Sequence, residues 1–310
     1  MSGTEIMEIV AAGVCGTDIQ RLRAGYSIRS LGHELAGRRN GDWALAAICP
    51  LNPCRICLAC ARGWTEQCAA DTGTGRLDTG QGGFSGQVRV HPGQVYPLPA
   101  HLPATVATLA DPLACIIHAF HGLPLNGKGL LIIGDGPLAA IAAVYARQHA
   151  ARVTMAVKDA SRVSRVSGFA DSVVAVEDAA VTHYDVVLEA VGGMSSAPIL
   201  TAISAVAPLG QVVALGVYRP DLAAVIPVRT LLEKESTLRG SKAYRVSAER
   251  DDFATALGQL ADCRDAYSPI ITSTPSWSPD DPQPPELERR NGMLKTVYVK
   301  EPAGPVTARP

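Results

Sequence analysis

Residues 129–148 read GLLIIGDGPLAAIAAVYARQ, and this stretch decides the fold. An apolar run at 129–133 precedes a turn of the pattern G-x-G-x-x-A, and an Ala-rich segment follows. The turn consists of Gly134, Asp135, Gly136, Pro137, Leu138 and Ala139. Glycines let the backbone approach a pyrophosphate closely, and the helix N-terminus offers free N–H groups to it. Pro137 suits the first helical position. The pattern predicts a strand, a dinucleotide-binding turn and a helix, with a plain tight turn as the alternative.

Apolar runs and helical stretches alternate from about residue 126 to residue 262. The predicted strands are 129–133, 152–157, 185–190 and 211–216, and the predicted helices are 137–148 and 252–261. This alternation is typical of βαβ units in an α/β, doubly wound parallel (Rossmann) sheet. Residues 1–112 are instead rich in Gly, Pro and Cys, which indicates β structure joined by tight turns.

The end of the second predicted strand indicates which dinucleotide binds. An acidic residue there holds the ribose 2′-OH of NAD, whereas a nearby cation accommodates the 2′-phosphate of NADP. The strand ends at Val157, Lys158 and Arg162 follow, and Asp159 stands two residues late. This order favours NADP(H), although NAD(H) stays possible. The alternative is that Lys158, Arg162 and Arg165 form a solvated helix face.

Four of the eight cysteines lie within fifteen residues, in the pattern C-x2-C-x2-C-x7-C. They are Cys54, Cys57, Cys60 and Cys68. Four thiolates so close together can wrap one tetrahedral ion and leave no open position, which describes a structural zinc site. The alternatives are a disulfide cluster and a coincidental grouping. Because the N-terminus lacks a secretion signal, we expect a cytoplasmic protein whose cysteines are reduced.

Composition narrows the classes of function. The net charge is −1 over 310 residues, so nucleic acid and acidic membranes are not expected partners. The most apolar stretch is interrupted by Gly134, Asp135, Gly136 and Pro137, so no membrane-spanning segment is predicted. With 47% hydrophobic residues the chain can bury a large core and is long enough for two domains.

Two further motifs contain residues that could bind a metal. Cys15-Gly-Thr17-Asp18 and Gly32-His33-Glu34 offer a thiolate, an imidazole and carboxylates away from the cysteine cluster. A catalytic zinc needs three protein ligands and one exchangeable position. These residue types are therefore candidates for a second metal site.

The chain resembles the zinc-containing medium-chain alcohol and polyol dehydrogenases from about residue 5 to residue 300. The motifs in the order of that family are Cys15-Gly-Thr-Asp, Gly32-His-Glu, the four-cysteine lobe, Gly82-Gly-Phe84, Asp111-Pro-Leu113 and the Gly134 turn. The resemblance implies a Rossmann domain at 121–265. It also implies a chaperonin-10-like (GroES-like) β-barrel catalytic domain at 1–120 and 266–310, with a structural zinc lobe at 49–70.

The resemblance also implies roles for single residues. Cys15 and His33 match the ligands of the catalytic zinc. Glu34 or Asp111 matches a further ligand, although Asp111 could cap the following helix and Cys15 could be a buried thiol. Asp18 resembles the carboxylate that orients the zinc-bound histidine. Thr17 resembles the hydroxyl that passes the substrate's proton.

The activity implied is zinc-dependent hydride transfer between NADP(H) or NAD(H) and a secondary alcohol or ketone. The substrate class is a small polyol, sugar or amino alcohol, and the Ala-, Arg- and Pro-rich composition is compatible with secondary metabolism. Two zinc ions per chain and a homodimer or homotetramer are expected. The alternative is a non-redox relative or pseudoenzyme that keeps only the structural zinc.

Three departures from the family pattern stand out. Gln20 replaces a histidine that completes a proton relay in many relatives. The hairpin usually found ahead of the strand at 5–11 is absent, and only residues 38–40 separate Gly37 from Gly41. We therefore expect a trimmed barrel with an exposed edge, which dimerisation could cover.

Overall fold

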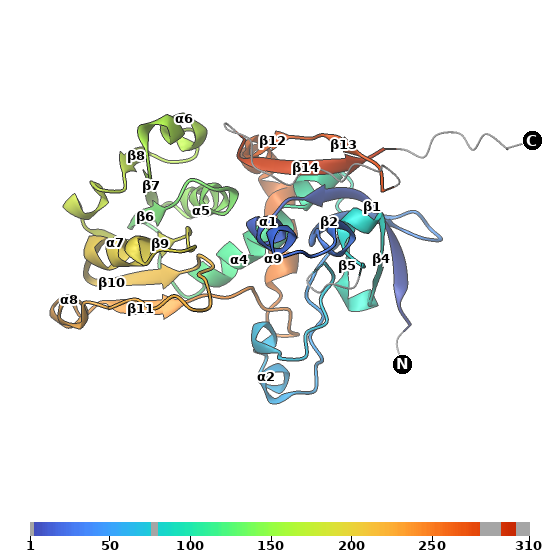
Figure 1. The fold of residues 1–310 in the computed structure, drawn as a ribbon, viewed down its shortest axis with the longest axis horizontal. Helices are drawn as coiled ribbons and strands as arrows, with labels where there is room; N and C mark the ends of the chain where they lie inside the picture. The colour runs from blue at the N-terminus through green and yellow to red at the C-terminus, as the bar shows by residue number, and fades with distance from the viewer. Residues whose placement is uncertain (1–2, 76–79, 280–292, 302–310) are drawn as a thin grey trace, which may run out of the picture. The chain divides into compact units, whose positions relative to one another are not determined.

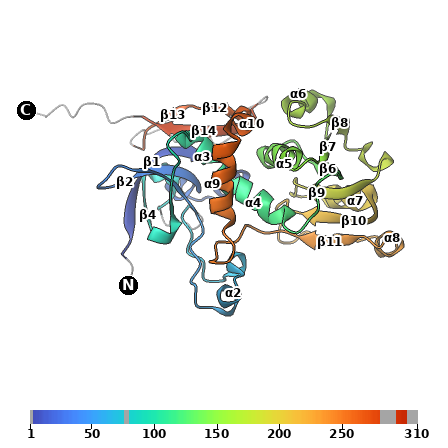
Figure 2. The ribbon, with the colours of Figure 1, turned by 180° about the vertical axis from the view of Figure 1, so that it is seen from behind.

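The computed structural model describes residues 3–75, 80–279 and 293–301. The chain forms two compact units, whose elements are labelled in Figures 1 and 2. The first unit comprises Met1–Asp111 and Arg245–Pro310, and the second comprises Pro112–Tyr244. Helix α4 (Ala110–Phe120) starts at the end of the first segment and continues into the second unit.

The second unit contains a six-stranded parallel sheet with the order β8-β7-β6-β9-β10-β11 (Figure 1). Its strands are β6 (Gly129–Ile133), β7 (Arg152–Val157), β8 (Ser172–Ala175), β9 (Tyr184–Glu189), β10 (Val206–Ala214) and β11 (Thr237–Gly240). Its helices are α5 (Pro137–Gln148), α6 (Val163–Val166), α7 (Ala197–Ala205) and α8 (Val228–Lys234), with 3-10 turns η5 (Ala160–Arg162) and η6 (Ala179–Val181). The strand order reverses at β6, which is the doubly wound arrangement. The predicted Rossmann fold is confirmed.

The β6–turn–α5 segment follows directly from its residues. Gly134 has a φ of +132°, a backbone conformation that is strained for residues with a side chain. Glycine adopts this conformation without that strain, which allows the chain to turn at the end of β6. Pro137 is the first residue of α5, where its missing N–H leaves no bond unmade. The bounds of β6, α5 and β7 are the ones that the sequence predicts.

The core of the second unit comes from alternation along β6. Leu131 and Ile133 pack in one cluster with Ile199 and Ile203 of α7. Their neighbours Leu130 and Ile132 are also completely buried, and successive side chains of a strand point to opposite faces. Because both faces of the sheet are covered at β6, the sequence of this strand is a continuous apolar run rather than an alternation of apolar and polar residues.

The first unit is built on an eight-stranded mixed sheet with the order β12-β14-β1-β2-β3-β5, in which β4 also pairs with β1 and β13 with β14. Its strands are β1 (Glu5–Gly13), β2 (Glu34–Arg39), β3 (Leu45–Ile48), β4 (Gln87–Val90), β5 (Val95–Pro97), β12 (Ile271–Ser273), β13 (Ser276–Trp277) and β14 (Lys295–Lys300). Its helices are α1 (Gly16–Arg23), α2 (Leu58–Ala61), α3 (Ala104–Ala107), α9 (Asp252–Asp262) and α10 (Arg264–Tyr267). Its 3-10 turns are η1 (Ile28–Ser30), η2 (Thr65–Gln67), η3 (Gly83–Ser85), η4 (Pro92–Gln94) and η7 (Ser268–Ile270).

Strand β1 organises this sheet. Its first half pairs with β4, its second half pairs with β14, and its other edge pairs with β2 along most of its length. The end of β1 therefore lies between the start of β2 and β14, where Gly13 is opposite both Glu34 and Val297. Among the described residues the hydrogen-bonded path ends at β12 and β5, and the trimmed barrel stays a prediction.

The core of the first unit includes an aromatic cluster. Phe84 meets Trp277 and Tyr298 edge-on, with ring centroids 5.7 and 5.8 Å apart. A Cβ on Gly32 would come within 3.1 Å of the Phe84 ring, and Gly32 has a φ of +86°. The aromatic cluster thus fixes the backbone immediately before His33.

The chain returns to the first unit at Arg245, earlier than the boundary near residue 265 that the sequence suggested. Helix α9 therefore belongs to the first unit, where it packs against α3 (Figure 2). The outgoing boundary falls after Asp111 rather than after residue 120. None of the described helices combines the length and apolar composition needed to cross a membrane.

Candidate functional site

A cluster of three potential metal ligands lies where β1 ends and β2 begins. Cys15 follows β1 and precedes α1, while His33 and Glu34 stand at the start of β2. One sulfur, one ring nitrogen and one carboxylate oxygen of these residues lie within 4.8 Å of one another. Thiolate, imidazole and carboxylate are the donors that zinc takes in proteins. The residues present therefore fit a zinc ion.

Asp18 orients the histidine of this cluster. Its carboxylate is completely buried, and Oδ1 lies 3.1 Å from both His33 Nδ1 and the Gly32 amide N. Oδ2 accepts a hydrogen bond from the Cys15 amide at 2.9 Å. A proton on His33 Nδ1 would satisfy Asp18, leaving the Nε2 lone pair to bind a metal. The carboxylate thus ties both ligand-bearing segments together.

The electrostatics agree with this pairing. Burial raises the pKa of Asp18, but the neighbouring His33 and the amides of Cys15 and Gly32 outweigh it, so the pKa lies below its ordinary value. Burial disfavours the charged ring of His33, but Asp18 and Cys15 raise its pKa well above the usual range. Asp18 and Cys15 thus favour a positive charge beside them.

Lys295 is a member of this site that sequence reasoning missed. Its ammonium pairs with Glu34 and donates to the Val14 carbonyl at 3.0 Å, with both paired side chains only 2% exposed. Burial raises the pKa of Glu34, and Lys295 opposes that rise. The signal in the sequence was a lysine inside the apolar run 293–299, where a charge needs a buried partner.

Asp111 and Thr17 lie around the three ligands. His33 Nε2 is 4.0 Å from Asp111 Oδ2, so this carboxylate faces the nitrogen that Asp18 leaves free. Asp111 also stands in the first turn of α4, where a carboxylate suits the helix N-terminus. Thr17 is in the first turn of α1 and is half-buried, while Gln20 is exposed.

The four clustered cysteines bring their sulfurs together. One Sγ from each of Cys54, Cys57, Cys60 and Cys68 lies within 4.8 Å of the others. All four are free thiols, so the disulfide alternative is wrong. Cys57 Sγ and Cys68 Sγ are 4.0 Å apart, and sulfurs at 2.3 Å from one tetrahedral ion would be about 3.8 Å apart. The cluster fits a closed tetrathiolate zinc site.

Backbone N–H groups prepare the cluster for a cation. Amides of Ile56 and Cys57 point at the Cys54 sulfur and lower its pKa to about 6. The Cys54 amide donates in turn to Cys68 Sγ at 3.3 Å. Arg55, which lies between Cys54 and Ile56 in the sequence, has a φ of +62°. The strained turn is the means by which the amides reach the sulfurs.

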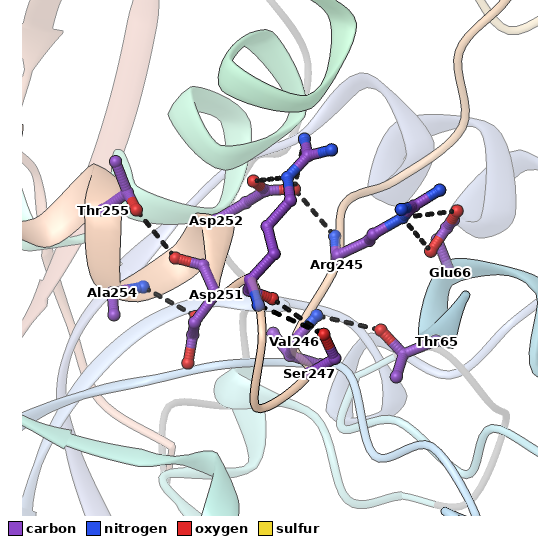
Figure 3. A network of polar contacts seen from close by, with 10 residues as sticks. Thr65, Glu66, Arg245, Val246, Ser247, Asp251, Asp252, Ala254 and Thr255 are labelled. Carbon is purple, nitrogen blue, oxygen red and sulfur yellow. Dashed lines mark hydrogen bonds and ion pairs between the residues drawn. The ribbon is translucent and has the colours of Figure 1, made fainter. Parts of the chain in front are cut away.

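The far end of the cysteine lobe is bonded to the segment that returns from the second unit (Figure 3). Thr65 Oγ1 accepts from the Val246 amide at 2.9 Å, and the Glu66 carboxylate accepts from Arg245 Nε at 3.1 Å. Asp252, at the start of α9, then accepts from the Arg245 amide at 2.9 Å. A lobe made mainly of loops is thus anchored to this segment by two residues that lie between Cys60 and Cys68.

The dinucleotide turn has the expected conformation in the second unit. The Gly134 amide donates to the Ala156 carbonyl at 3.0 Å, which holds the turn against the end of β7. Gly136 is the residue before α5, and Pro137 and Leu138 begin the helix. The free amides of this helix start can bind an anion. Asp135 differs from the rest because it brings a carboxylate into the turn.

Cations surround that carboxylate at the end of β7. Val157 is buried, Lys158 is exposed, and Arg162 Nη1 donates to Asp135 Oδ2 at 2.9 Å. Asp159, the acidic residue that follows, accepts from the Ser161 amide at 3.1 Å. It acts as the cap of η5 rather than as an open ribose acceptor.

Several known proteins are similar to this chain in sequence or in structure. No protein-family model matches the chain. The chain is 29% identical over 283 residues to L-idonate 5-dehydrogenase (NAD(P)(+)) of Escherichia coli (strain K12), covering 83% of this chain and 80% of that protein. It is 27% identical over 265 residues to D-altritol 5-dehydrogenase of Agrobacterium fabrum, covering 77% and 76%. A zinc-binding dehydrogenase of Sinorhizobium meliloti 1021, solved with NADP, has a TM-score of 0.83 at 22% identity, covering 96% and 92%, which supports the fold.

Proposed function

Because the chain belongs to the zinc-containing medium-chain dehydrogenase/reductase family, we propose that it transfers a hydride between NAD(P)(H) and a secondary alcohol or ketone of a polyol. The observation that carries this proposal is the meeting of Cys15, His33 and Glu34, with Asp18 behind the histidine, in a chain that also has a dinucleotide turn. The relatives whose names specify L-idonate and D-altritol support a polyhydroxylated substrate.

Cys15 and His33 would hold the catalytic zinc, with Glu34 or Asp111 as a further ligand. When bound, zinc supplies a Lewis acid that polarises a carbonyl or lowers the pKa of an alcohol. Asp18 keeps the proton of His33 on Nδ1, so that Nε2 stays available. Lys295 balances the charge of the buried Glu34 carboxylate.

Thr17 would pass the proton of the substrate hydroxyl. Its hydroxyl can both accept and donate, and it stands two residues after Cys15 in the first turn of α1. Gln20 cannot titrate, so the proton leaves from Thr17 to water rather than through a histidine. This is the main chemical departure from the relay of many relatives.

The cofactor would bind along the second unit. Gly134, Gly136, Pro137 and Leu138 would line the pyrophosphate site at the start of α5. NADP(H) is the preferred form, because the end of β7 presents Lys158 and Arg162, and Asp159, the carboxylate that follows this strand in the sequence, already caps η5. This preference is tested by comparing the Michaelis constants for NADPH and NADH.

Cys54, Cys57, Cys60 and Cys68 would hold a second, structural zinc. A tetrathiolate leaves no position for substrate, so this ion would stabilise the lobe without taking part in the reaction. Two zinc ions per chain are therefore proposed. Thiolate ligands need a reducing environment, which supports a cytoplasmic location.

We also propose a homodimer or homotetramer. β11 is the last strand of its sheet, and α8, which precedes it, exposes Val228 and Leu232 at 69% and 72%. An open strand edge beside exposed apolar side chains favours association. Size-exclusion chromatography with light scattering tests this, and a monomer at micromolar concentration would contradict it.

The deciding experiment combines a metal count with a substrate panel. Purified protein is assayed by mass spectrometry for zinc and by absorbance at 340 nm with alditols, aldonates and amino alcohols. We expect two zinc ions per chain and cofactor-dependent turnover of at least one polyol. One zinc ion together with no change in cofactor absorbance would favour the non-redox alternative and reject the proposal.

A further inference from the structure

The phosphate-binding turn contains a carboxylate where a bound dinucleotide would bring negative charge. Asp135 stands between Gly134 and Gly136, and its side chain is 17% exposed. The start of α5 behind it is suited to a pyrophosphate. An aspartate here would weaken anion binding unless its charge were compensated.

Two arginines compensate that charge. Arg162 Nη1 is 2.9 Å from Asp135 Oδ2, and Arg165 Nη1 is 3.7 Å from the same oxygen. Both come from one turn after β7, where residues three apart lie on the same face. Asp135 thus draws two guanidinium groups toward the dinucleotide turn.

Both arginines keep donors for a further acceptor. Arg162 Nε pairs with Asp159 at 3.2 Å, and Arg162 Nη1 pairs with Asp135. A guanidinium has five N–H groups in total, so these two contacts leave other donors of Arg162 for a ligand. Arg165 Nε is fully buried and has no hydrogen-bond partner within the described part of the chain. That Nε is shielded from solvent, so a ligand oxygen would reach Arg165 through the exposed part of its side chain, which is 17% exposed.

The surrounding charges favour an anion over a neutral hydroxyl. Lys158, Arg162 and Arg165 carry three positive charges, and Asp135 and Asp159 carry two negative ones, which leaves a net charge of +1. The ends of the adjacent parallel strands β6 and β7 carry these groups. In a doubly wound sheet this is where the adenosine ribose lies. A 2′-phosphate, which is close to dianionic, fits this charge better than a 2′-hydroxyl.

We propose that Asp135 is a positioning residue that holds Arg162 and Arg165 in place for the 2′-phosphate and so sets the preference for NADP(H). The inference rests on the proposed function, because it concerns the cofactor of the same site. A long arginine side chain loses rotamer freedom when it binds a ligand, and an ion pair formed beforehand removes part of that loss. Repulsion between Asp135 and the phosphate is weaker, since the charge of Asp135 is already paired with two guanidinium groups.

Replacing Asp135 changes phosphate affinity in opposite directions under the two explanations. If Asp135 positions the arginines, its removal weakens binding; if it mainly repels the phosphate, its removal strengthens binding. Asp135→Ala and Asp135→Asn are titrated by calorimetry with adenosine 2′,5′-bisphosphate and with AMP, which differ only in the 2′-phosphate. We expect Asp135→Ala to weaken bisphosphate binding by about tenfold and AMP binding by less than about twofold. Asp135→Asn, which keeps an acceptor and loses the charge, should fall between. Unchanged or tighter bisphosphate binding overturns the inference, as does an equal loss for both ligands.

A double-mutant cycle tests whether Asp135 acts through the arginines. In an Arg162→Ala, Arg165→Ala background, Asp135→Ala should change bisphosphate affinity by less than about twofold. A full tenfold loss in that background would overturn the proposal. Glu233→Ala is the matched control, since it removes a carboxylate from an exposed pair with Arg229 in the same unit and should leave both affinities unchanged.

This test separates the inference from the proposed function. Absence of cofactor-dependent turnover with every alcohol would reject the dehydrogenase activity. The two adenosine ligands are measured by binding without turnover, so their affinities still decide the role of Asp135.

Discussion

Lys295 and Glu34 form a buried ion pair that joins the last strand of the first unit to the ligand-bearing start of β2. The partners are 261 residues apart in the sequence. Lys295 also donates to the carbonyl of Val14, the residue before the proposed ligand Cys15. One ammonium therefore holds the two segments that bring the proposed metal ligands together.

Lys295→Met should destabilise the protein strongly, because it leaves the Glu34 carboxylate buried without a counter-charge. Removing one partner of a buried pair costs about 3–5 kcal/mol. Urea unfolding of the metal-free protein measures the loss. Adding Glu34→Gln should recover part of it, because an amide needs no counter-charge. Equal stability of Lys295→Met and the parent protein would show that the pair is dispensable.

The sequence predicted the second unit better than the first for a physical reason. The bounds of β6, α5 and β7 depend on local signals: an apolar run, a glycine turn and a helix start at Pro137. The Lys295–Glu34 pair depends on contacts between distant strands, and no local pattern shows which carboxylate a lysine in an apolar run will meet.

Helix α9 shows the same limit at the level of units. Its apolar periodicity is as suitable for a Rossmann helix as for any other amphipathic helix, so the sequence placed it in the nucleotide-binding domain. Its attachment is decided by Asp252, which bonds the Arg245 amide beside the cysteine lobe. The cysteine cluster could be predicted from the sequence because closely spaced thiols are chemically distinctive. The hydrogen bond from Val246 to Thr65 could not, because it uses an ordinary hydroxyl.

The two cysteine groups should respond differently to substitution. Cys15→Ser should abolish turnover while leaving the thermal midpoint within about 2 °C, since it removes a ligand from an open site. Cys57→Ser should instead lower the free energy of unfolding by several kcal/mol, because a structural zinc contributes folding energy directly. Each variant should lose about one zinc ion per chain.

These assays use turnover, calorimetry and mass spectrometry on the same preparations. Wild-type activity in Cys15→Ser would disprove its place in the catalytic site. Unaltered stability in Cys57→Ser would disprove the structural role of the clustered thiols.

Asp185 should make stability depend on pH in the acid range. The Gly129 amide, 2.8 Å from Oδ2, lowers its pKa, burial opposes this, and Lys128 at 3.3 Å lowers it further. Because the folded-state pKa lies below the unfolded value, the carboxylate stabilises the fold above about pH 4. That contribution is lost as the pH falls through the folded pKa.

Asp185→Asn should therefore cost about 0.5–1 kcal/mol at pH 7, since the side chain is partly exposed and screened. The difference from the parent protein should shrink in urea titrations below about pH 4. Asp221→Asn, which removes a carboxylate paired with the exposed Arg219, is the control and should change stability less. A difference that grows toward low pH would reverse the assignment.

Thr65→Val should loosen the cysteine lobe from the segment that follows the second unit (Figure 3). Valine has nearly the shape of threonine but cannot accept the bond from the Val246 amide, which is buried. A buried N–H left without an acceptor costs about 1–3 kcal/mol, and urea unfolding at neutral pH measures that loss. Thr65→Ser keeps the hydroxyl and should lose less. If Thr65→Val is as stable as the parent protein, the hydrogen bond to Val246 does not anchor the lobe, and the lobe is held chiefly by its thiolates and by Glu66.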